Sequence, residues 1–117
     1  MERTVEYYKN AAGHESAAGS IDGLPVETRT RVLRLIKLLK DYGVLLKGPY
    51  TKQIRGKIRE LRINDGHGAI IILYFTYTGK RFILLHGFIK KTDRTPLREI
   101  ETAEGRMNDF IRRENIP

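Results

Sequence analysis

The sequence predicts a small α+β domain. We expect about four strands, an N-terminal strand and a three-strand meander, in an antiparallel sheet with helices against one face. Three observations favour this class: an alternating segment opens the chain, three β-rich segments follow one another between residues 57 and 89, and two helical segments flank them. A chain of 117 residues can bury one hydrophobic core, so we expect a single domain over residues 1–117.

The N-terminal part contains a strand and the first long helix. Apolar and polar side chains alternate over residues 3–8, which predicts a short strand. Ala, Gly and Ser dominate residues 10–23, where we expect one helical turn at 17–21. Apolar side chains recur every three or four positions over residues 25–42, which predicts an amphipathic helix that ends at Gly43.

The C-terminal part contains the meander and the second long helix. We expect strands at residues 57–64, 69–77 and 82–89, because β-branched and aromatic residues are frequent there and turn residues separate them. The middle strand is almost wholly apolar, so both of its faces should be covered. An apolar stripe after Pro96 predicts a helix over residues 96–113.

Positive charge is concentrated in two windows of a chain whose net charge is +8. Residues 47–62 and residues 80–98 each hold six basic side chains against one acidic side chain, and the rest of the chain is slightly acidic. Such segregation indicates a polyanionic partner, with a solvated surface as the alternative. Because the windows lie at the entry and the exit of the meander, we expect them to converge into one positive groove.

Several classes of site and compartment are disfavoured. The chain has no cysteine, and His14, His67 and His86 follow no metal-ligand spacing, so we expect neither a metal nor a cofactor. No apolar run approaches the roughly 20 residues of a membrane span. The first residues lack the apolar segment of a secretion signal, so we expect a cytoplasmic protein without a membrane partner.

Four stretches contain motifs that resemble those of a known family. They are Lys52-Gln-Ile54 followed by Glu60-Leu-Arg62, then Leu73-Tyr-Phe75, the run Leu84-Leu-His-Gly-Phe-Ile-Lys-Lys-Thr-Asp-Arg-Thr-Pro96, and Ala103 with Arg106 in the last predicted helix. In these motifs the chain resembles the RelE/HigB superfamily of bacterial toxins, most closely its phage-derived branch, over residues 24–113. The resemblance implies a RelE-like fold.

The resemblance also implies an activity and partners. Such toxins of type II toxin-antitoxin systems are mRNA interferases that cut mRNA on the ribosome, and a cognate helix-turn-helix antitoxin holds them inactive. Cutting needs no metal, because the 2′-hydroxyl of the RNA attacks the adjacent phosphate. A non-catalytic toxin of the ParE type, which binds DNA gyrase, is the alternative, although the Lys-Lys-Thr motif favours the endoribonuclease.

By the same resemblance, Arg62 clamps the scissile phosphate, and Lys90 and Lys91 hold the RNA backbone or transfer protons. The alternatives are an ion pair between Arg62 and Glu60 and a solvated strand end at the two lysines. The other expected RNA contacts are Lys52, Arg55, Lys57, Arg59 and Arg94.

Four further positions have two interpretations or depart from the family. Tyr74 and His86 lie in apolar strands, so each is either a core residue or a catalytic residue. For His86 the catalytic role would be that of a general base. Relatives carry an arginine where this chain has Ile71, so we expect Ile71 on the groove face, where its side chain cannot bind a phosphate as an arginine would. The basic face of residues 29–40 is either a solubility surface or a docking site for ribosomal RNA or an acidic antitoxin segment.

Overall fold

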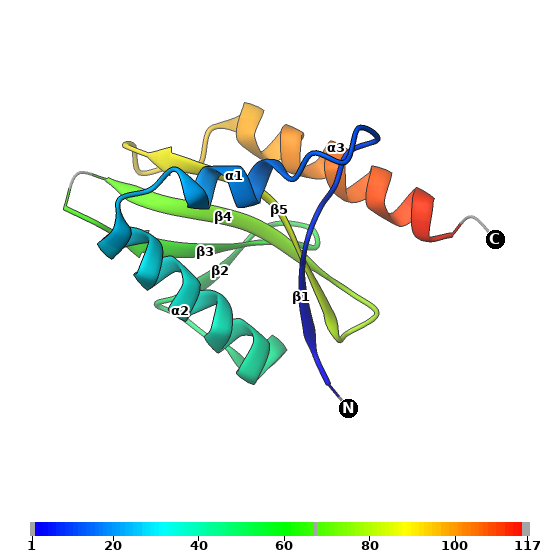
Figure 1. Ribbon diagram of the computed structural model, residues 1–117, viewed down its shortest axis with the longest axis horizontal. Coiled ribbons are helices and arrows are strands. Elements are labelled where there is room, and N and C mark those ends of the chain that lie inside the picture. The colour runs from blue at the N-terminus through cyan, green and yellow to red at the C-terminus, as the bar shows by residue number, and fades with distance from the viewer. Residues whose placement is uncertain (1, 67, 116–117) are drawn as a thin grey trace.

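The computed structural model describes residues 2–66 and 68–115, and it has the predicted α+β class. Its elements are β1 (Thr4–Tyr7), α1 (Ser16–Asp22), α2 (Val26–Tyr42), the short 3-10 helix η1 (Gly43–Leu45), β2 (Thr51–Arg55), β3 (Ile58–Asn64), β4 (Ala69–Tyr77), β5 (Arg81–Lys90) and α3 (Leu97–Glu114) (Figure 1). The predicted strands and both long helices are confirmed to within a few residues. Within the described residues, no helix has the length and apolar character of a membrane span.

The sheet differs from the predicted one in strand number and direction. It has five strands in the order β1-β5-β4-β3-β2, and β1 runs parallel to β5 while all other pairs are antiparallel. Alternation did not predict β2, because its sequence Thr-Lys-Gln-Ile-Arg is polar and its strand conformation comes from pairing with β3 at the sheet edge. The parallel β1 follows from the long connection through α1, α2 and the meander that separates it from β5.

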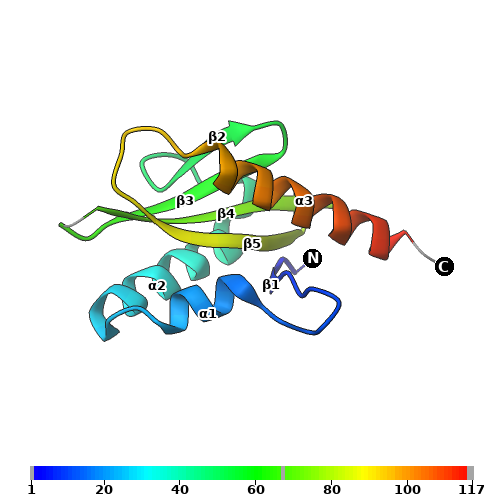
Figure 2. The ribbon, with the colours of Figure 1, turned by 90° about the horizontal axis from the view of Figure 1, so that it is seen from above.

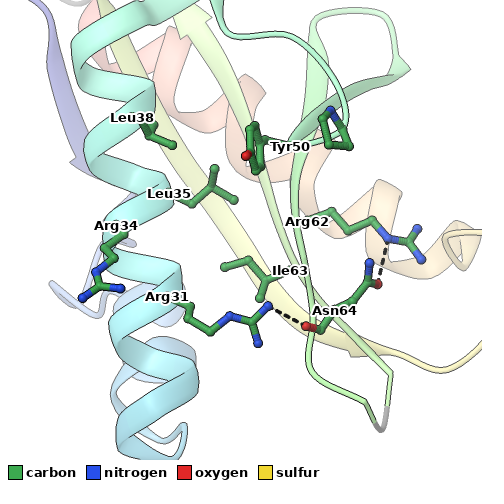
Figure 3. A pocket seen from close by; sticks show the side chains of 9 residues that line it. Arg31, Arg34, Leu35, Leu38, Tyr50, Arg62, Ile63 and Asn64 are labelled. Atoms are coloured by element: carbon green, nitrogen blue, oxygen red, sulfur yellow. Dashed lines mark hydrogen bonds between the residues drawn. The ribbon is translucent and has the colours of Figure 1, made fainter.

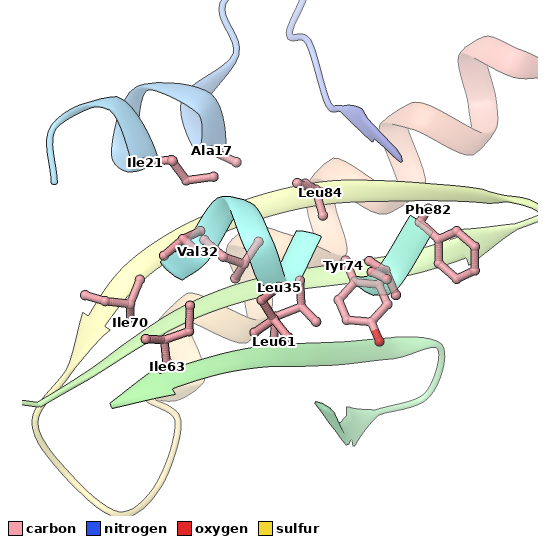
Figure 4. Close-up of a cluster of buried hydrophobic side chains, with 12 residues drawn as sticks. Ala17, Ile21, Val32, Leu35, Leu61, Ile63, Ile70, Tyr74, Phe82 and Leu84 are labelled. Carbon is pink, nitrogen blue, oxygen red and sulfur yellow. The ribbon is translucent and has the colours of Figure 1, made fainter. Parts of the chain in front are cut away.

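Helices cover both faces of the sheet, so the expectation of helices on one face was wrong. Figure 2 shows α1 and α2 on one side and α3 on the other. The apolar run of β4 is the physical reason, since its alternate residues enter two different cores. The core under α1 and α2 is drawn in Figure 4 and includes Leu35, Leu61, Ile72 and Leu84. The core under α3 includes Ile71, Leu73, Phe75, Leu85 and Ala103.

Gly43 ends α2 as predicted, and it also allows β1 to approach the helix. Its φ of 57° lies in the left-handed region that favours glycine. A Cβ at this position would lie 2.5 Å from Cδ of Arg3. The Arg3 Nε donates a hydrogen bond to the carbonyl oxygen of Lys40 at 2.8 Å, so Arg3 satisfies one of the terminal carbonyls of α2.

Candidate functional site

Strand pairing collects polar side chains on the face of the sheet that α3 partly covers. Lys52 of β2 lies opposite Glu60 of β3, Glu60 opposite Leu73 of β4, and Leu73 opposite His86 of β5. Directly opposed residues of neighbouring strands point to the same face. Because Leu73 belongs to the core under α3, the whole row points to the α3 side.

Two further predicted RNA-binding cations, Arg62 and Lys90, lie on the same face of the sheet. Arg62 continues the same alternation along β3, and its Nε donates to Oδ1 of Asn64 at 3.3 Å (Figure 3). Asn64 lies opposite Ala69, and Ala69 lies opposite Lys90 at the end of β5. We call the set Lys52, Glu60, Arg62, His86 and Lys90 the site face.

Arg59 and Tyr74 lie on the opposite face of the sheet, under α2. The hydroxyl of Tyr74 lies 2.8 Å from Oγ1 of Thr51, and the residue is 2% exposed within the core (Figure 4). The Arg59 Nε donates to the same Thr51 oxygen at 3.4 Å. These two residues are therefore separated from the site face by the thickness of the sheet.

The remaining predicted cations are dispersed. Arg55 pairs with Glu104 of α3, with its Nε 3.0 Å from Oε2, and this pair raises the pKa of Arg55 and lowers the pKa of Glu104. Lys57 is exposed in the turn between β2 and β3, while Lys91 and Arg94 are exposed between β5 and α3. The expected single groove is thus wrong, because the two basic windows are divided between the faces and ends of the sheet.

A comparison with known families identifies the chain. A family model described as "Phage derived protein Gp49-like (DUF891)" matches residues 20–108. The chain belongs to this family. Gp49-like proteins are toxin-antitoxin-related proteins, and the matched segment runs from α1 into α3 and includes every residue of the site face. No curated protein matches the chain.

Glu60 is the residue of this Gp49-like protein for which no role was expected beyond a pair with Arg62. It is 1% exposed, and its buried Oε1 has no hydrogen-bond partner among the described residues. Arg62 bonds to Asn64 instead, so the expected pair is not formed. One signal in the sequence points to Glu60, since it is the only acidic residue in the basic window 47–62.

Lys90 also has an unusual environment for a lysine. Only 5% of the residue is exposed, whereas Lys91 is exposed. Within the described part of the chain, no hydrogen bond or ion pair engages the Lys90 ammonium. Its Nζ is not among the buried polar atoms that lack a partner, so the ammonium itself reaches solvent. The site face of the Gp49-like chain therefore holds a buried carboxylate at Glu60 and, at the end of β5, an ammonium at the surface.

His86 joins β5 to α3. Its Nε2 lies 2.8 Å from Oε2 of Glu99, and Arg106 approaches its Nδ1 at 3.1 Å while also donating to the Leu85 carbonyl at 2.8 Å. A guanidinium only donates hydrogen bonds, so Nδ1 accepts and the proton lies on Nε2. Both ring nitrogens are occupied, which leaves neither of them for a substrate.

Ile71 does not lie on an open groove, and that expectation was wrong. It is fully buried in the core under α3, between Arg62 on β3 and Phe88 on β5. The central position of β4 is the reason, because both of its faces are covered. The cations of the site face consequently come from β2, β3 and β5.

Metal ligands do not cluster in the described segments. No group of three or more His, Asp or Glu side chains is placed to hold an ion there. His14 is exposed, and His67 lies outside the described residues. Metal-free chemistry stays a prediction.

Proposed function

We propose that this Gp49-like protein is the toxin of a type II toxin-antitoxin system and cuts mRNA on the ribosome as an endoribonuclease of the RelE/HigB type. One observation carries the proposal: Lys52, Arg62 and Lys90 share a face with the unpaired carboxylate of Glu60. Three cations suit the RNA backbone, and a free carboxylate suits a proton acceptor. Membership of a toxin-antitoxin-related family supports the role of toxin.

The proposed reaction is an attack by the 2′-oxygen of the RNA on its adjacent phosphorus. A bond forms between the 2′-oxygen and phosphorus, and the bond from phosphorus to the 5′-oxygen breaks. The products are a 2′,3′-cyclic phosphate and a 5′-hydroxyl. One proton leaves the 2′-oxygen and one reaches the 5′-oxygen, while the charge on the phosphorane is stabilised.

Each task has a candidate on the site face. Glu60 Oε1 accepts the proton of the 2′-hydroxyl, and Arg62 holds two phosphate oxygens with parallel N–H groups. Lys90 stabilises the charge and donates a proton to the leaving oxygen. Lys52 is exposed on the edge strand opposite Glu60, where its flexible side chain contacts the RNA backbone.

Other residues have supporting roles in this proposal. The exposed side chains of Lys57, Lys91 and Arg94 contact RNA outside the reacting phosphate. His86 is a positioning residue, because its two nitrogens fasten β5 to α3. Arg59 and Tyr74 take no part in catalysis, since they lie on the opposite face of the sheet, and Arg55 is held by its ion pair with Glu104.

The proposal extends to partners and organisation. A helix-turn-helix antitoxin inhibits the protein in the cytoplasm, residues 1–117 form one domain, and neither a metal nor a cofactor takes part. A small helix-turn-helix reading frame beside the gene would support the antitoxin. Co-purification of the two products would then test their binding directly.

The decisive experiment uses purified protein, ribosomes and a defined mRNA. Mapped 5′ ends give the cutting rate, and the 3′ ends of the products are tested for cyclic phosphate. We expect Glu60→Gln, which keeps the side-chain shape, to slow cutting by about 100-fold or more because the proton acceptor is removed. Arg59→Gln on the opposite face is the matched control and should change the rate less than about threefold.

Three outcomes would overturn the proposal. Products with a 3′-hydroxyl would exclude attack by the 2′-oxygen. Full activity in Glu60→Gln would show that Glu60 is not the proton acceptor. Growth arrest without mRNA cutting, together with inhibited DNA gyrase, would favour the non-catalytic toxin of the ParE type.

A further inference from the structure

The pairing of β4 with β5 contains one extra residue, Leu85. Leu73 of β4 lies opposite His86, whereas the next residue of β4, Tyr74, lies opposite Leu84. Leu85 therefore has no partner on β4, and this part of β5 is a β-bulge. Because an extra residue changes the alternation of a strand, the bulge decides the direction of every later side chain of β5.

The bulge brings Lys90 to the site face. In a regular strand Leu84 and Lys90, which are six positions apart, would point to the same face of the sheet. Leu84 belongs to the core under α1 and α2 (Figure 4). Lys90 instead lies opposite Ala69, which belongs to the core under α3. The cation that the proposed reaction takes from β5 thus owes its direction to one extra residue.

A side chain of α3 holds the bulge. Leu85 is fully buried, and the backbone of an extra residue lies outside the ladder of the sheet, so its carbonyl oxygen needs another donor. Nη1 of Arg106 donates to this oxygen at 2.8 Å and to Nδ1 of His86 at 3.1 Å. Nε2 of His86 in turn donates to Glu99 at 2.8 Å. Arg106 therefore binds both residues at the bulge from outside the sheet.

The part of β5 after the bulge is the part that can turn. Residues 81–84 pair with β1 on one side and with β4 on the other. Among the described strands, residues 86–90 pair with β4 only. If the bulge were lost, the doubly paired half would keep its register, and the half that carries Lys90 would turn over.

We propose that Arg106 is a positioning residue, which directs Lys90 to the site face by holding the bulge at Leu85. The catalytic consequence rests on the proposed function, because Lys90 acts there on the phosphate and on the leaving oxygen. Without Arg106, a buried carbonyl loses its donor, and regular pairing of β5 turns Lys90 toward the α1 side.

Thiol labelling reports the direction of β5 directly, because the chain has no cysteine of its own. Ile89 lies opposite Ile70 of the core under α1 and α2 and is 56% exposed, whereas Lys90 is 5% exposed. Ile89→Cys should therefore react with a thiol reagent at least about tenfold faster than Lys90→Cys. When Arg106→Met is added to each, the ratio of the two rates should fall to about one or below.

A double-mutant cycle tests whether Arg106 acts through Lys90. Arg106→Met keeps the apolar stem and removes the donors, so we expect it to slow mRNA cutting at least about tenfold. Adding Lys90→Ala should then slow cutting by less than about twofold further, because the lysine is already displaced. Lys52→Ala on β2 should slow the wild type and Arg106→Met by the same factor.

Arg112→Met is the matched control, because it removes an exposed guanidinium from the same helix, and it should keep the rate within about twofold of wild type. Thermal melting checks that each variant is folded at the assay temperature. If Arg106→Met does not fold, Arg106→Lys replaces it in both experiments. It keeps the charge with a shorter reach, so we expect changes in the same direction but smaller.

Three results would overturn the role of Arg106. They are an unchanged labelling ratio, equal decreases in Arg106→Met and Arg112→Met, and effects of Arg106→Met and Lys90→Ala that multiply. Multiplying effects would give Arg106 an independent contact with RNA. Labelling needs no substrate, so a wild-type chain that cuts no mRNA but shows the expected labelling would refute the proposed function and leave the control of β5 by Arg106 in place.

Discussion

Arg59 and Arg62 lie on the same strand, β3, but on opposite faces of the sheet. Their separation of three residues reverses the direction of the side chain. Arg59 bonds to Thr51 under α2, while Arg62 points to the α3 side and bonds to Asn64. A cluster of basic residues in the sequence is therefore not one surface in the fold.

Substitutions of Arg62 and of Arg59 should have very different effects on the rate of mRNA cutting. Arg62→Ala should slow mRNA cutting by on the order of 100-fold, because it removes a preorganised donor to the developing phosphorane charge. Arg62→Lys keeps the charge but lacks the two parallel hydrogen bonds, so it should recover only part of the rate. Arg59→Ala should stay near wild type in the same ribosome assay. Equal decreases at both positions would contradict the assignment of the site to one face.

Salt should weaken RNA binding by a predictable amount. Six cations remain as candidate contacts once Arg55 and Arg59 are set aside, and about 0.7 counterions are released per contact on single-stranded RNA. Affinity should then fall about 300-fold between 50 and 200 mM salt. Eight contacts would give a decrease of about 2,000-fold, and a salt-independent affinity would exclude a polyanion partner. Titration of a short labelled oligonucleotide measures the slope.

Removal of the unpaired carboxylate should not destabilise the protein. Glu60→Leu replaces a buried group that lacks a partner on Oε1, so the free energy of unfolding should stay the same or rise by about 1 kcal/mol. Cutting should be abolished in the same variant. Urea denaturation gives the free energy. A decrease of several kcal/mol would instead mean that Glu60 has a structural partner.

Ile71→Arg should damage the fold. Ile71 is fully buried under α3, and an unpaired guanidinium there costs several kcal/mol. We expect an insoluble protein or a melting temperature far below wild type, while the control Ile71→Val should cost about 0.5–1.5 kcal/mol. A well-folded Ile71→Arg with faster cutting would show that this position is open to RNA.

Acid should weaken the contact between Tyr8, which follows β1, and Asp109 of α3. The hydroxyl of Tyr8 donates to Asp109 at 2.6 Å, and this bond, with Arg113 and Arg112 nearby, lowers the pKa of Asp109. Its folded pKa lies below its unfolded value, so the stabilisation is present above about pH 4 and disappears as the pH falls through the folded pKa. Asp109→Asn should melt below wild type at pH 7, and the difference should shrink toward pH 2. A constant difference would contradict this linkage.

Part of the candidate site was predictable from sequence motifs, and part was not. Arg62, Lys90 and Lys52 were predicted from the resemblance of short motifs, and strand pairing places them on one face. The importance of Glu60 was missed, because a carboxylate among cations suggests an ion pair until its neighbours are known to bond elsewhere.

The sequence by itself determined the α+β class, the two long helices and four of the strands, because these depend on periodicity and turn residues along the chain. The tertiary structure decided the edge strand β2, the parallel pairing of β1 and the covering of both faces by helices. It also decided which cations share the site face. The reason is that pairing partners and burial depend on residues distant in sequence, and moving a side chain by one strand position sends it to the other side of the sheet.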